Sequence, residues 1–329
     1  MNDCLLIIRL SSLGDIIHTL PAYAALRRNY PNSKITWIVE TKGKDILDFV
    51  PGIDEIIVVG SRGWRTKIAK KYSIALDFQG LVKSGLIAFL SRAPKRIGFH
   101  RKNLKEPLAA HFYTDRIEEI PEARHVISKN LKLLSLLGIH EDRYQFPLAI
   151  PEEIGNAVQE KLQPLGYEKI KKLVIFNVGA AWRTKRWSPE SWVKVLEGLD
   201  RKTLFPLLLW GNEVERKLAA AISTETHVPP APFFSIQEIL GLVQEAGLVV
   251  SGDTFALQAA CALSVPVVGL FGPTNPQRNG PFSPRDKVAY HPVECSLCYK
   301  RTCESLECMK KITPEEVTHL VLQSLEENG

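Results

Sequence analysis

The chain of 329 residues has no long apolar run, and this absence excludes a membrane-spanning helix. None of its apolar runs approaches the roughly 20 residues that a helix needs to cross a bilayer. Its first residues, Met1-Asn2-Asp3-Cys4, include an acid and pass directly into a strand-like segment, which is unlike a signal peptide. With 45% apolar and 24% charged residues the composition is that of a soluble globular protein, and we expect it in the cytoplasm.

Two phosphate-binding fingerprints are also missing. The chain contains no Gly-x-Gly, so it lacks the glycines that let a dinucleotide-binding loop approach a pyrophosphate closely. The Gly-Lys-Ser/Thr sequence of the P-loop is absent as well. These absences disfavour hydride transfer and P-loop phosphoryl transfer.

The order of apolar runs predicts the domain organisation. The chain is too long for one ordinary core, so two domains are the default expectation. Strand-like runs alternate with helical ones, which predicts an α/β fold with two Rossmann-like, doubly wound parallel sheets whose strand-end edges face one cleft. A linker with two prolines is expected near 150, giving domains at 1–150 and 151–312. A last helix at 313–329 could pack back on the first domain.

The expected elements are defined by their residue ranges. Strands are predicted at 4–10, 34–40, 55–59, 74–78, 96–99, 173–178, 204–210, 248–251 and 265–271. Helices are predicted at 16–30, 42–50, 82–91, 125–137, 151–165, 189–199, 213–222, 236–246 and 254–263. Pro21 should kink the first helix or limit it to a short first piece. Thr313 and Glu316 should form a capping box at the last helix.

The segment 247–275 has the pattern of one strand–helix–strand unit. Its polar residues lie only at 251–254 and 272–275, at the carboxyl ends of the two strands. Open α/β sheets bind their ligands at that edge. The free backbone N–H groups of residues 253–256, where the helix begins, suit an anion such as a phosphate.

Asp15 follows the first strand and has two interpretations. It is suited to cap the first helix. A carboxylate at this strand end could also take a proton from a substrate hydroxyl. The residue type and position alone favour the helix cap.

Two further strand ends carry charged residues. The loop Trp182-Arg183-Thr184-Lys185-Arg186-Trp187 places three cations beside a helix start, which suits phosphate binding. The alternative is a basic surface loop, although exposed tryptophan is uncommon. Glu213 and Glu215 follow another strand, where a carboxylate could bind ribose hydroxyls or simply favour the dipole of its helix.

Positive charge gathers in the first domain. The net charge is +6, and residues 62–105 contain 12 lysines and arginines against one acid, Asp77. One interpretation is a solvated basic face. The other is a surface for an anionic partner, such as a phosphosugar, an anionic lipid or a nucleic acid.

Six cysteines are present, and four of them form a cluster in the sequence. Cys4 and Cys261 lie in apolar runs and are expected to be buried thiols. The other four have the spacing Cys295-x2-Cys298-x4-Cys303-x4-Cys308, which is zinc-like in character but not a standard pairing. A structural zinc, a redox-labile cluster and merely local thiols stay open, and we assign no metal.

Three motifs together resemble one enzyme family. They are Ser-Ser-Leu-Gly-Asp-Ile-Ile-His-Thr-Leu-Pro at 11–21, Asp-Phe-Gln-Gly-Leu-Val-Lys-Ser at 77–84, and Ser-Gly-Asp-Thr at 251–254 with Phe-Gly-Pro-Thr-Asn-Pro at 271–276. They resemble the signatures of the bacterial ADP-heptose:lipopolysaccharide heptosyltransferases, glycosyltransferase family 9, in family order along the chain. Residues 105–113 look most like heptosyltransferase I, and the cysteine-rich tail is more similar to heptosyltransferase II.

The resemblance implies a GT-B fold and inverting, metal-independent heptose transfer from ADP-heptose to the lipopolysaccharide inner core, without a cofactor. It implies Kdo-lipid A or heptosyl-Kdo-lipid A as the acceptor. It places the catalytic aspartate on Asp15 and the donor-phosphate lysine on Lys185. The donor-binding residues it implies are Ser11, Gly14, Glu215 (or Glu213), Asp253, Thr254, Gly272 and Thr274. One departure is Ala180-Ala181, where the first branch of the family has a hydroxyl residue.

The acceptor is expected at the basic region, with Arg62, Arg65, Lys67 and Lys83 as first candidates. That region would also hold the enzyme at the anionic inner face of the inner membrane, with no nucleic-acid partner. Three alternatives stay open. One is a family 9 transferase of another sugar, and a second is a sugar-nucleotide epimerase with the same fold, which needs no acceptor. The third is a non-catalytic protein that binds anionic surfaces.

Overall fold

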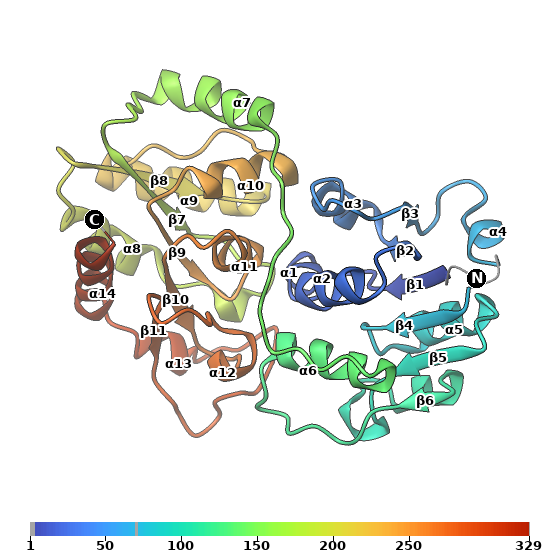
Figure 1. The fold of residues 1–329 in the computed structure, drawn as a ribbon. Coiled ribbons are helices and arrows are strands. Elements are labelled where there is room, and N and C mark those ends of the chain that lie inside the picture. The colour runs from blue at the N-terminus through green and yellow to red at the C-terminus, as the bar shows by residue number, and fades with distance from the viewer. Residues whose placement is uncertain (1–3, 70–71, 329) are drawn as a thin grey trace. The chain divides into compact units, whose positions relative to one another are not determined.

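The computed structural model describes residues 4–69 and 72–328. The first three residues, which argue against a signal peptide, lie outside this part of the chain. The chain forms two compact units, Met1–Ala149 (unit 1) and Ile150–Gly329 (unit 2), both drawn in Figure 1. Within the described residues no helix is both long and apolar enough to cross a membrane.

Unit 1 is built on a parallel sheet of six strands in the order β3-β2-β1-β4-β5-β6. The strands are β1 (Cys4–Ile8), β2 (Lys34–Val39), β3 (Glu55–Val58), β4 (Ile74–Asp77), β5 (Lys95–Gly98) and β6 (Asp115–Arg116). The two strands beside β1 are β2 and β4, so the loops that follow these three strands meet at one edge. Apart from the short β6, which the sequence analysis missed, these strands match the predicted runs. The central strands β1 and β2 are mostly apolar because both faces of a parallel sheet are covered.

Helices cover both faces of this sheet. They are α1 (Leu13–Ile17), α2 (Leu20–Asn29), α3 (Thr41–Leu47), α4 (Trp64–Ile68), α5 (Val82–Leu90) and α6 (Val126–Leu133). Ile68 of α4 and Ile87 of α5 share one core cluster with Leu6 of β1, which places both helices on the same face. Helix α2 packs instead against α6.

The first helical region differs from the prediction. The expected helix at 16–30 is two helices, and Pro21 lies in the first turn of the second one, where its missing N–H is no loss. Ser12, not Asp15, is the N-cap of α1. Asp15 is the third helical residue and accepts hydrogen bonds from the Ser12 backbone N–H (3.1 Å) and hydroxyl (2.9 Å). The prediction that Asp15 is the cap itself is therefore wrong.

Unit 2 has a parallel sheet of five strands in the order β11-β10-β9-β7-β8. The strands are β7 (Lys172–Asn177), β8 (Leu204–Leu209), β9 (Leu248–Gly252), β10 (Val267–Phe271) and β11 (Lys287–Tyr290). The predicted strand–helix–strand unit is β9, α11 (Phe255–Ala262) and β10. The two strands β9 and β10 are hydrogen-bonded to each other in parallel. The sequence analysis missed β11, an edge strand with an exposed side.

The other helices of unit 2 pack on the two faces of its sheet. They are α7 (Glu152–Leu162), α8 (Pro189–Glu197), α9 (Glu213–Thr226), α10 (Ile236–Gln244), α12 (Pro276–Asn279), α13 (Glu307–Lys310) and α14 (Pro314–Glu327). Trp192 of α8, Ile222 of α9 and Val321 of α14 share one core cluster. Helix α10 packs against α7 and α11.

The C-terminal helix α14 uses its apolar face within unit 2, where it packs on α8 and on β10 and β11. Val317 and Val321 are fully buried there. Thr313 caps the helix as predicted, since its hydroxyl accepts from the Glu316 N–H. Glu316 does not close the expected capping box, because its carboxylate lies 2.7 Å from His291 Nε2.

Candidate active site

At the carboxyl edge of unit 1, a buried arginine holds an exposed carboxylate. Arg9 follows β1, and its guanidinium lies 2.7 Å from Asp15 and also donates to the Phe78 carbonyl. Only 8% of the Arg9 side chain is exposed, against 39% of the Asp15 side chain. The partner of a buried cation is thus presented at the surface of this edge.

The electrostatics of Asp15 favour its ionised form. Enclosure by neighbouring atoms raises the pKa, but Arg9, His18 and the two Ser12 donors lower it by more, so the pKa lies below the usual 3.8. Asp15 is therefore a carboxylate at neutral pH. It has the form that a proton acceptor needs.

The other predicted residues of this loop make backbone contacts. The Ser11 N–H donates to Gln79 Oε1 at 3.3 Å, and the Leu10 N–H donates to the same oxygen at 3.0 Å. The Gly14 carbonyl accepts from the His18 N–H at 3.0 Å, inside the α1–α2 turn. Gln79 thus ties the loop after β4 to the loop after β1.

Asp77, at the end of β4, has a structural role. Its carboxylate is fully buried and accepts from the Gln79 N–H (2.8 Å), the Gly80 N–H (3.1 Å) and the Tyr113 hydroxyl (2.7 Å). Burial raises its pKa. These contacts shape the turn after β4, which carries Gln79 and leads to Lys83. Asp77 therefore holds this turn in place, while its own carboxylate stays buried.

The four predicted acceptor-binding cations lie on two elements. Lys83 begins α5 and pairs with Glu40, which follows β2, at 2.9 Å, so it belongs to the same edge as Asp15. Arg62, Arg65 and Lys67 are exposed on the segment around α4, where the Arg65 guanidinium lies 5.0 Å from the Trp64 ring centroid. Lys83 is linked through Glu40 to the loop after β2, whereas the α4 segment follows β3, the outermost strand of the sheet.

At the carboxyl edge of unit 2, Asn177 connects two neighbouring strand ends. Its amide donates to the hydroxyls of Ser251 and Thr254, both at 2.9 Å, from β7 to the β9–α11 turn. Thr254 occupies the N-cap position of α11, but its side chain makes no cap hydrogen bond. The predicted helix start is therefore present without a side-chain cap on its first N–H groups, as an anion site needs.

Lys185 lies on the loop after β7 and reaches the same turn. Its ammonium is 2.7 Å from the Asp253 carboxylate and 3.1 Å from the Asp253 carbonyl. The ammonium also lies 4.4 Å from the centroid of the Trp182 ring. The structure thus brings together the predicted donor residues Lys185, Asp253 and Thr254.

Glu215 and Glu213 are clearly distinguished by the structure. Glu215 is buried, accepts from the Gly211 N–H at 2.8 Å and pairs with Arg186 at 3.6 Å. Glu213 is exposed and pairs with Arg216 on its own helix. Gly179 passes so close to Glu215 that any side chain at 179 would clash with the carboxylate. Of the two acids, Glu215 is the one at the strand edge.

The loop after β10 carries the remaining predicted donor residues. Thr274 is buried, and its hydroxyl has no hydrogen-bond partner among the described residues. A side chain at Gly272 would clash with Met309. This loop therefore lies tightly against the segment that contains the cysteine cluster.

The segment with the four clustered cysteines, residues 295–308, contacts two loops of unit 2: the loop after β7, which carries Lys185, and the loop after β10, which carries Thr274. The Tyr299 N–H donates to the Pro273 carbonyl at 3.1 Å, and the Thr184 hydroxyl donates to the Lys300 carbonyl at 2.7 Å. The Arg301 guanidinium lies 5.3 Å from the Trp182 ring centroid. The segment therefore holds the loops of Lys185 and Thr274 in place.

The cysteines themselves do not form a metal site in this structure. Within residues 4–69 and 72–328 no three cysteine, histidine or acidic side chains come together to hold a metal ion. Cys308 is buried in the core, which raises the pKa of its thiol, whereas Cys295 is exposed. Cys261 is a buried thiol as predicted, but Cys4 is only partly buried.

The comparisons with known proteins fit this geometry. The model of glycosyltransferase family 9 (heptosyltransferase) matches residues 62–309. This chain belongs to glycosyltransferase family 9. The family and the enzyme class that the three motifs indicated are thereby confirmed, although Asp15 lies outside the matched residues.

Curated relatives of this family 9 glycosyltransferase share most of its length. Lipopolysaccharide heptosyltransferase 1 of Pseudomonas aeruginosa is 28% identical, over 91% of this chain and 86% of the relative. The enzyme of the same name from Campylobacter coli is 30% identical, over 83% of this chain and 85% of the relative.

Solved structures share its fold. A family 9 glycosyltransferase from Veillonella parvula has a TM-score of 0.82 at 22% identity, covering 99% of this chain and 97% of the other. The E. coli heptosyltransferase WaaC with ADP has a TM-score of 0.75, also at 22% identity, covering 99% of each chain. The predicted GT-B fold, with two Rossmann-like units, is confirmed.

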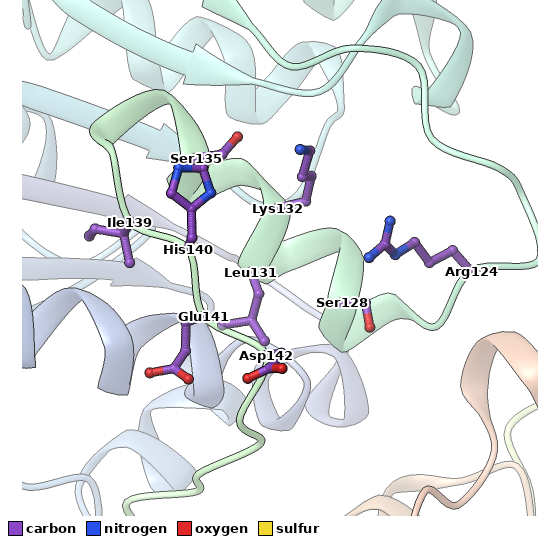
Figure 2. A pocket seen from close by; sticks show the side chains of 9 residues that line it. All are labelled: Arg124, Ser128, Leu131, Lys132, Ser135, Ile139, His140, Glu141 and Asp142. Atoms are coloured by element: carbon purple, nitrogen blue, oxygen red, sulfur yellow. The ribbon is translucent and has the colours of Figure 1, made fainter.

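Two hollows of unit 1 are lined by other residues than those predicted for the site. One of about 340 Å³ is lined by residues of α6 and of the segment that follows it, such as Lys132 and His140, as Figure 2 shows. Another of about 600 Å³ is lined by residues between His100 and Glu119. Neither contains a residue predicted for the site.

Several residues that contact the predicted site residues were not predicted from the sequence. Arg9, Gln79 and Asn177 each contact a predicted residue or its loop. Arg186, one of the three cations of the predicted basic loop, pairs with Glu215. Arg9 and Asn177 are polar residues at the ends of buried strands, and this position in the sequence could have marked them as site residues. No sequence pattern marked Tyr299, because its contact with Pro273 joins two loops that are distant in sequence.

Proposed function

We propose that this glycosyltransferase transfers L-glycero-D-manno-heptose from ADP-heptose to the Kdo-lipid A end of the lipopolysaccharide inner core, with inversion. The curated relatives at 28% and 30% identity are named lipopolysaccharide heptosyltransferase 1, which supports a first rather than a later heptose. The WaaC structures contain ADP or an ADP-heptose analogue, which supports an ADP-linked donor. The cytoplasm, where such a donor would be available, is the proposed location.

The observation that carries the mechanism is the exposed, ionised Asp15 on its buried Arg9. The acceptor hydroxyl attacks the anomeric carbon of the donor, and Asp15 takes the hydroxyl proton as the new carbon–oxygen bond forms. The bond from the anomeric carbon to the ADP oxygen breaks at the same time, giving one displacement with inversion. A base with a lowered pKa suffices, because the hydroxyl becomes acidic as it attacks; such catalysis is typically worth about 10²–10⁴-fold.

The donor binds at the carboxyl edge of unit 2. Its diphosphate is met by Lys185, by the uncapped N–H groups at the start of α11, and by the loop from Gly272 to Thr274. Glu215 accepts hydrogen bonds from the ribose hydroxyls, and Asp253 contacts the sugar. These groups supply the positive charge for the leaving ADP, so we propose that no divalent ion takes part.

The acceptor binds at the carboxyl edge of unit 1. Its anionic groups are met by Lys83 beside the catalytic edge and by Arg62, Arg65 and Lys67 around α4. The same positive surface draws the enzyme to an anionic membrane. Unit 1 is thus the acceptor domain and unit 2 the donor domain.

The test is a transfer assay with ADP-heptose or a UDP-sugar as donor and Kdo-lipid A, with or without an existing heptose, as acceptor. We expect one heptose to be added to the heptose-free acceptor from ADP-heptose only, at the same rate in EDTA. Use of a UDP-sugar, or a need for added magnesium, would contradict the proposal. Release of an epimerised sugar from the donor alone would favour the epimerase.

A further inference from the structure

An apolar surface of unit 1 has no described partner. Four large apolar side chains are exposed: Leu86 (43%), Phe89 (54%) and Leu90 (42%) on α5, and Leu108 (64%) on the 3₁₀ helix Pro107–Phe112. In the described part of unit 1 these are all the large apolar side chains with such exposure. We call these four residues the α5 patch.

The four side chains belong to one surface, because the two helices that carry them are packed together. The rings of Phe89 and Phe112 lie 6.2 Å apart, centroid to centroid. The two backbones approach so closely at Gly85 that a Cβ there would lie 3.3 Å from the Ala109 carbonyl. On α5 the exposed residues have the spacing i, i+3, i+4, while the intervening Ile87 faces the core.

Cations surround the α5 patch. Lys83 lies on the same helix stripe as Leu86 and Leu90, and the Arg96 guanidinium lies 5.8 Å from the Phe89 ring centroid. Arg92 and Lys105 are exposed nearby, and neither pairs with a carboxylate in the described residues. The acid of this region, Glu106, is occupied, since it accepts from the Val82 N–H where α5 begins.

We propose that the α5 patch docks on an anionic lipid bilayer, with its apolar side chains among the acyl chains and the surrounding cations on headgroup phosphates. An apolar surface edged with lysine and arginine is the arrangement that binds anionic membranes at their interface. The inference rests on the proposed function, in which the acceptor is a membrane lipid, and it names the surface that reaches that lipid.

The positive edge argues for a bilayer rather than a second copy of the chain. A two-fold dimer through this surface would bring the same cations of two copies together, because a two-fold interface contacts itself. The position of Lys83 adds a second argument. It begins the stripe of the patch and pairs with Glu40 at the edge that carries Asp15, so the patch extends from the proposed acceptor site.

The test measures binding of the full chain to vesicles. Vesicles of phosphatidylcholine alone are compared with vesicles containing phosphatidylglycerol, for the wild-type protein, Phe89→Ser/Leu108→Ser and the matched control Ile170→Ser/Leu322→Ser. The control residues are exposed apolar side chains of unit 2 (88% and 41%). Thermal unfolding checks that each variant is folded, and light scattering gives its oligomeric state.

We expect the wild-type protein and the control to bind the anionic vesicles and not the neutral ones, with binding weakened by salt. The patch variant should bind about tenfold or more weakly, since it no longer buries two large apolar side chains in the bilayer. Equal binding of patch variant and control, or no binding by the wild-type protein, would overturn the proposal. The proposal would also be overturned if the wild-type protein and the control were dimers and the patch variant a monomer.

Transfer to a water-soluble, deacylated Kdo acceptor is measured in parallel, because this reaction needs no bilayer. A wild-type protein that binds anionic vesicles through the patch but transfers nothing to any acceptor would disprove the proposed function alone. Transfer to the soluble acceptor without vesicle binding would disprove the membrane patch alone.

Discussion

At the carboxyl edge of each sheet one ion pair has a buried partner and a more exposed one, and the exposed partner has opposite charge in the two units. In unit 1 the cation is buried: 8% of the Arg9 side chain is exposed, against 39% of Asp15. In unit 2 the acid is buried: 6% of the Glu215 side chain is exposed, against 24% of Arg186. A buried charge needs a partner, and the partner that stays near water can meet a ligand. One edge thus offers a carboxylate and the other offers cations.

This difference matches what the two halves of a glycosyl transfer require. A proton acceptor must be ionised and reachable, as Asp15 is. A diphosphate needs positive charge held in place by buried acids, as Lys185 and Arg186 are by Asp253 and Glu215. Two parallel sheets of the same general kind therefore differ in chemistry through a few residues at their carboxyl edges.

The largest expected effect comes from removing the carboxylate of unit 1. Asp15→Asn should lower kcat by about 10²–10⁴-fold, because the attacking hydroxyl loses its base. ADP affinity, measured by titration calorimetry, should stay within about twofold, since unit 2 is untouched. Asp48→Asn is the matched control, because Asp48 is also a paired acid of unit 1. A variant with near wild-type turnover would show that Asp15 is not the base.

A smaller loss is expected from removing a cation of unit 2. Lys185→Ala should weaken ADP binding by about 10–100-fold, because a hydrogen bond to a charged group is worth about 1.5–3 kcal/mol. The rate should fall as well. Lys194→Ala, an exposed lysine on α8, is the control. Unchanged ADP affinity in calorimetry would place the diphosphate elsewhere.

A third prediction concerns the close contact between Gly179 and the buried carboxylate of Glu215. Gly179→Ala should force Glu215 to move and lower both the melting temperature and the ADP affinity, the latter by about tenfold or less. Gly155→Ala is the control, because a Cβ there meets nothing nearer than 3.9 Å. It should be neutral or slightly stabilising, since alanine favours a helix. Equal behaviour of the two variants would contradict the strained fit at Gly179.

The smallest effect is a shift of pH dependence. The folded-state pKa of Asp15 lies below 3.8, so its ionised form and the stability it contributes are present above that pH and lost as the pH falls through the folded pKa. Arg9→Gln should raise this pKa and move the acid limb of kcat/KM to higher pH. Arg27→Gln, which breaks the Arg27–Asp54 pair elsewhere in unit 1, is the control. Identical pH profiles would show that Arg9 does not tune Asp15.

The sequence alone determined the fold class and most elements. Strands such as β7 and β10 are continuous apolar runs because both faces of a parallel sheet are covered, so their sequence reveals them without knowledge of their neighbours. The short β6 and the partly exposed β11 lack that pattern and were missed. The split at Pro21 was foreseen, because proline restricts the backbone locally.

The candidate site divides in the same way. Strand ends pointed to Asp15 in the first domain and to Lys185, Asp253 and Thr254 in the second, because open sheets bind ligands at their carboxyl edges. The resemblance to the family, not the strand pattern, gave these residues their predicted roles. The sequence could not choose between Glu213 and Glu215, because the choice depends on which side of α9 faces the sheet. It also assigned the cap of α1 to Asp15, although the N-cap is Ser12, three residues earlier.

Only the tertiary structure decided which charges are buried and which partners they have. Arg9 on Asp15, Arg186 on Glu215 and Tyr299 on Pro273 are contacts between segments that the chain brings together by folding. Local patterns encode helices and strands because these depend on neighbouring residues. Burial and pairing depend on distant ones, and they determine which edge of this glycosyltransferase exposes a carboxylate and which exposes positive charge.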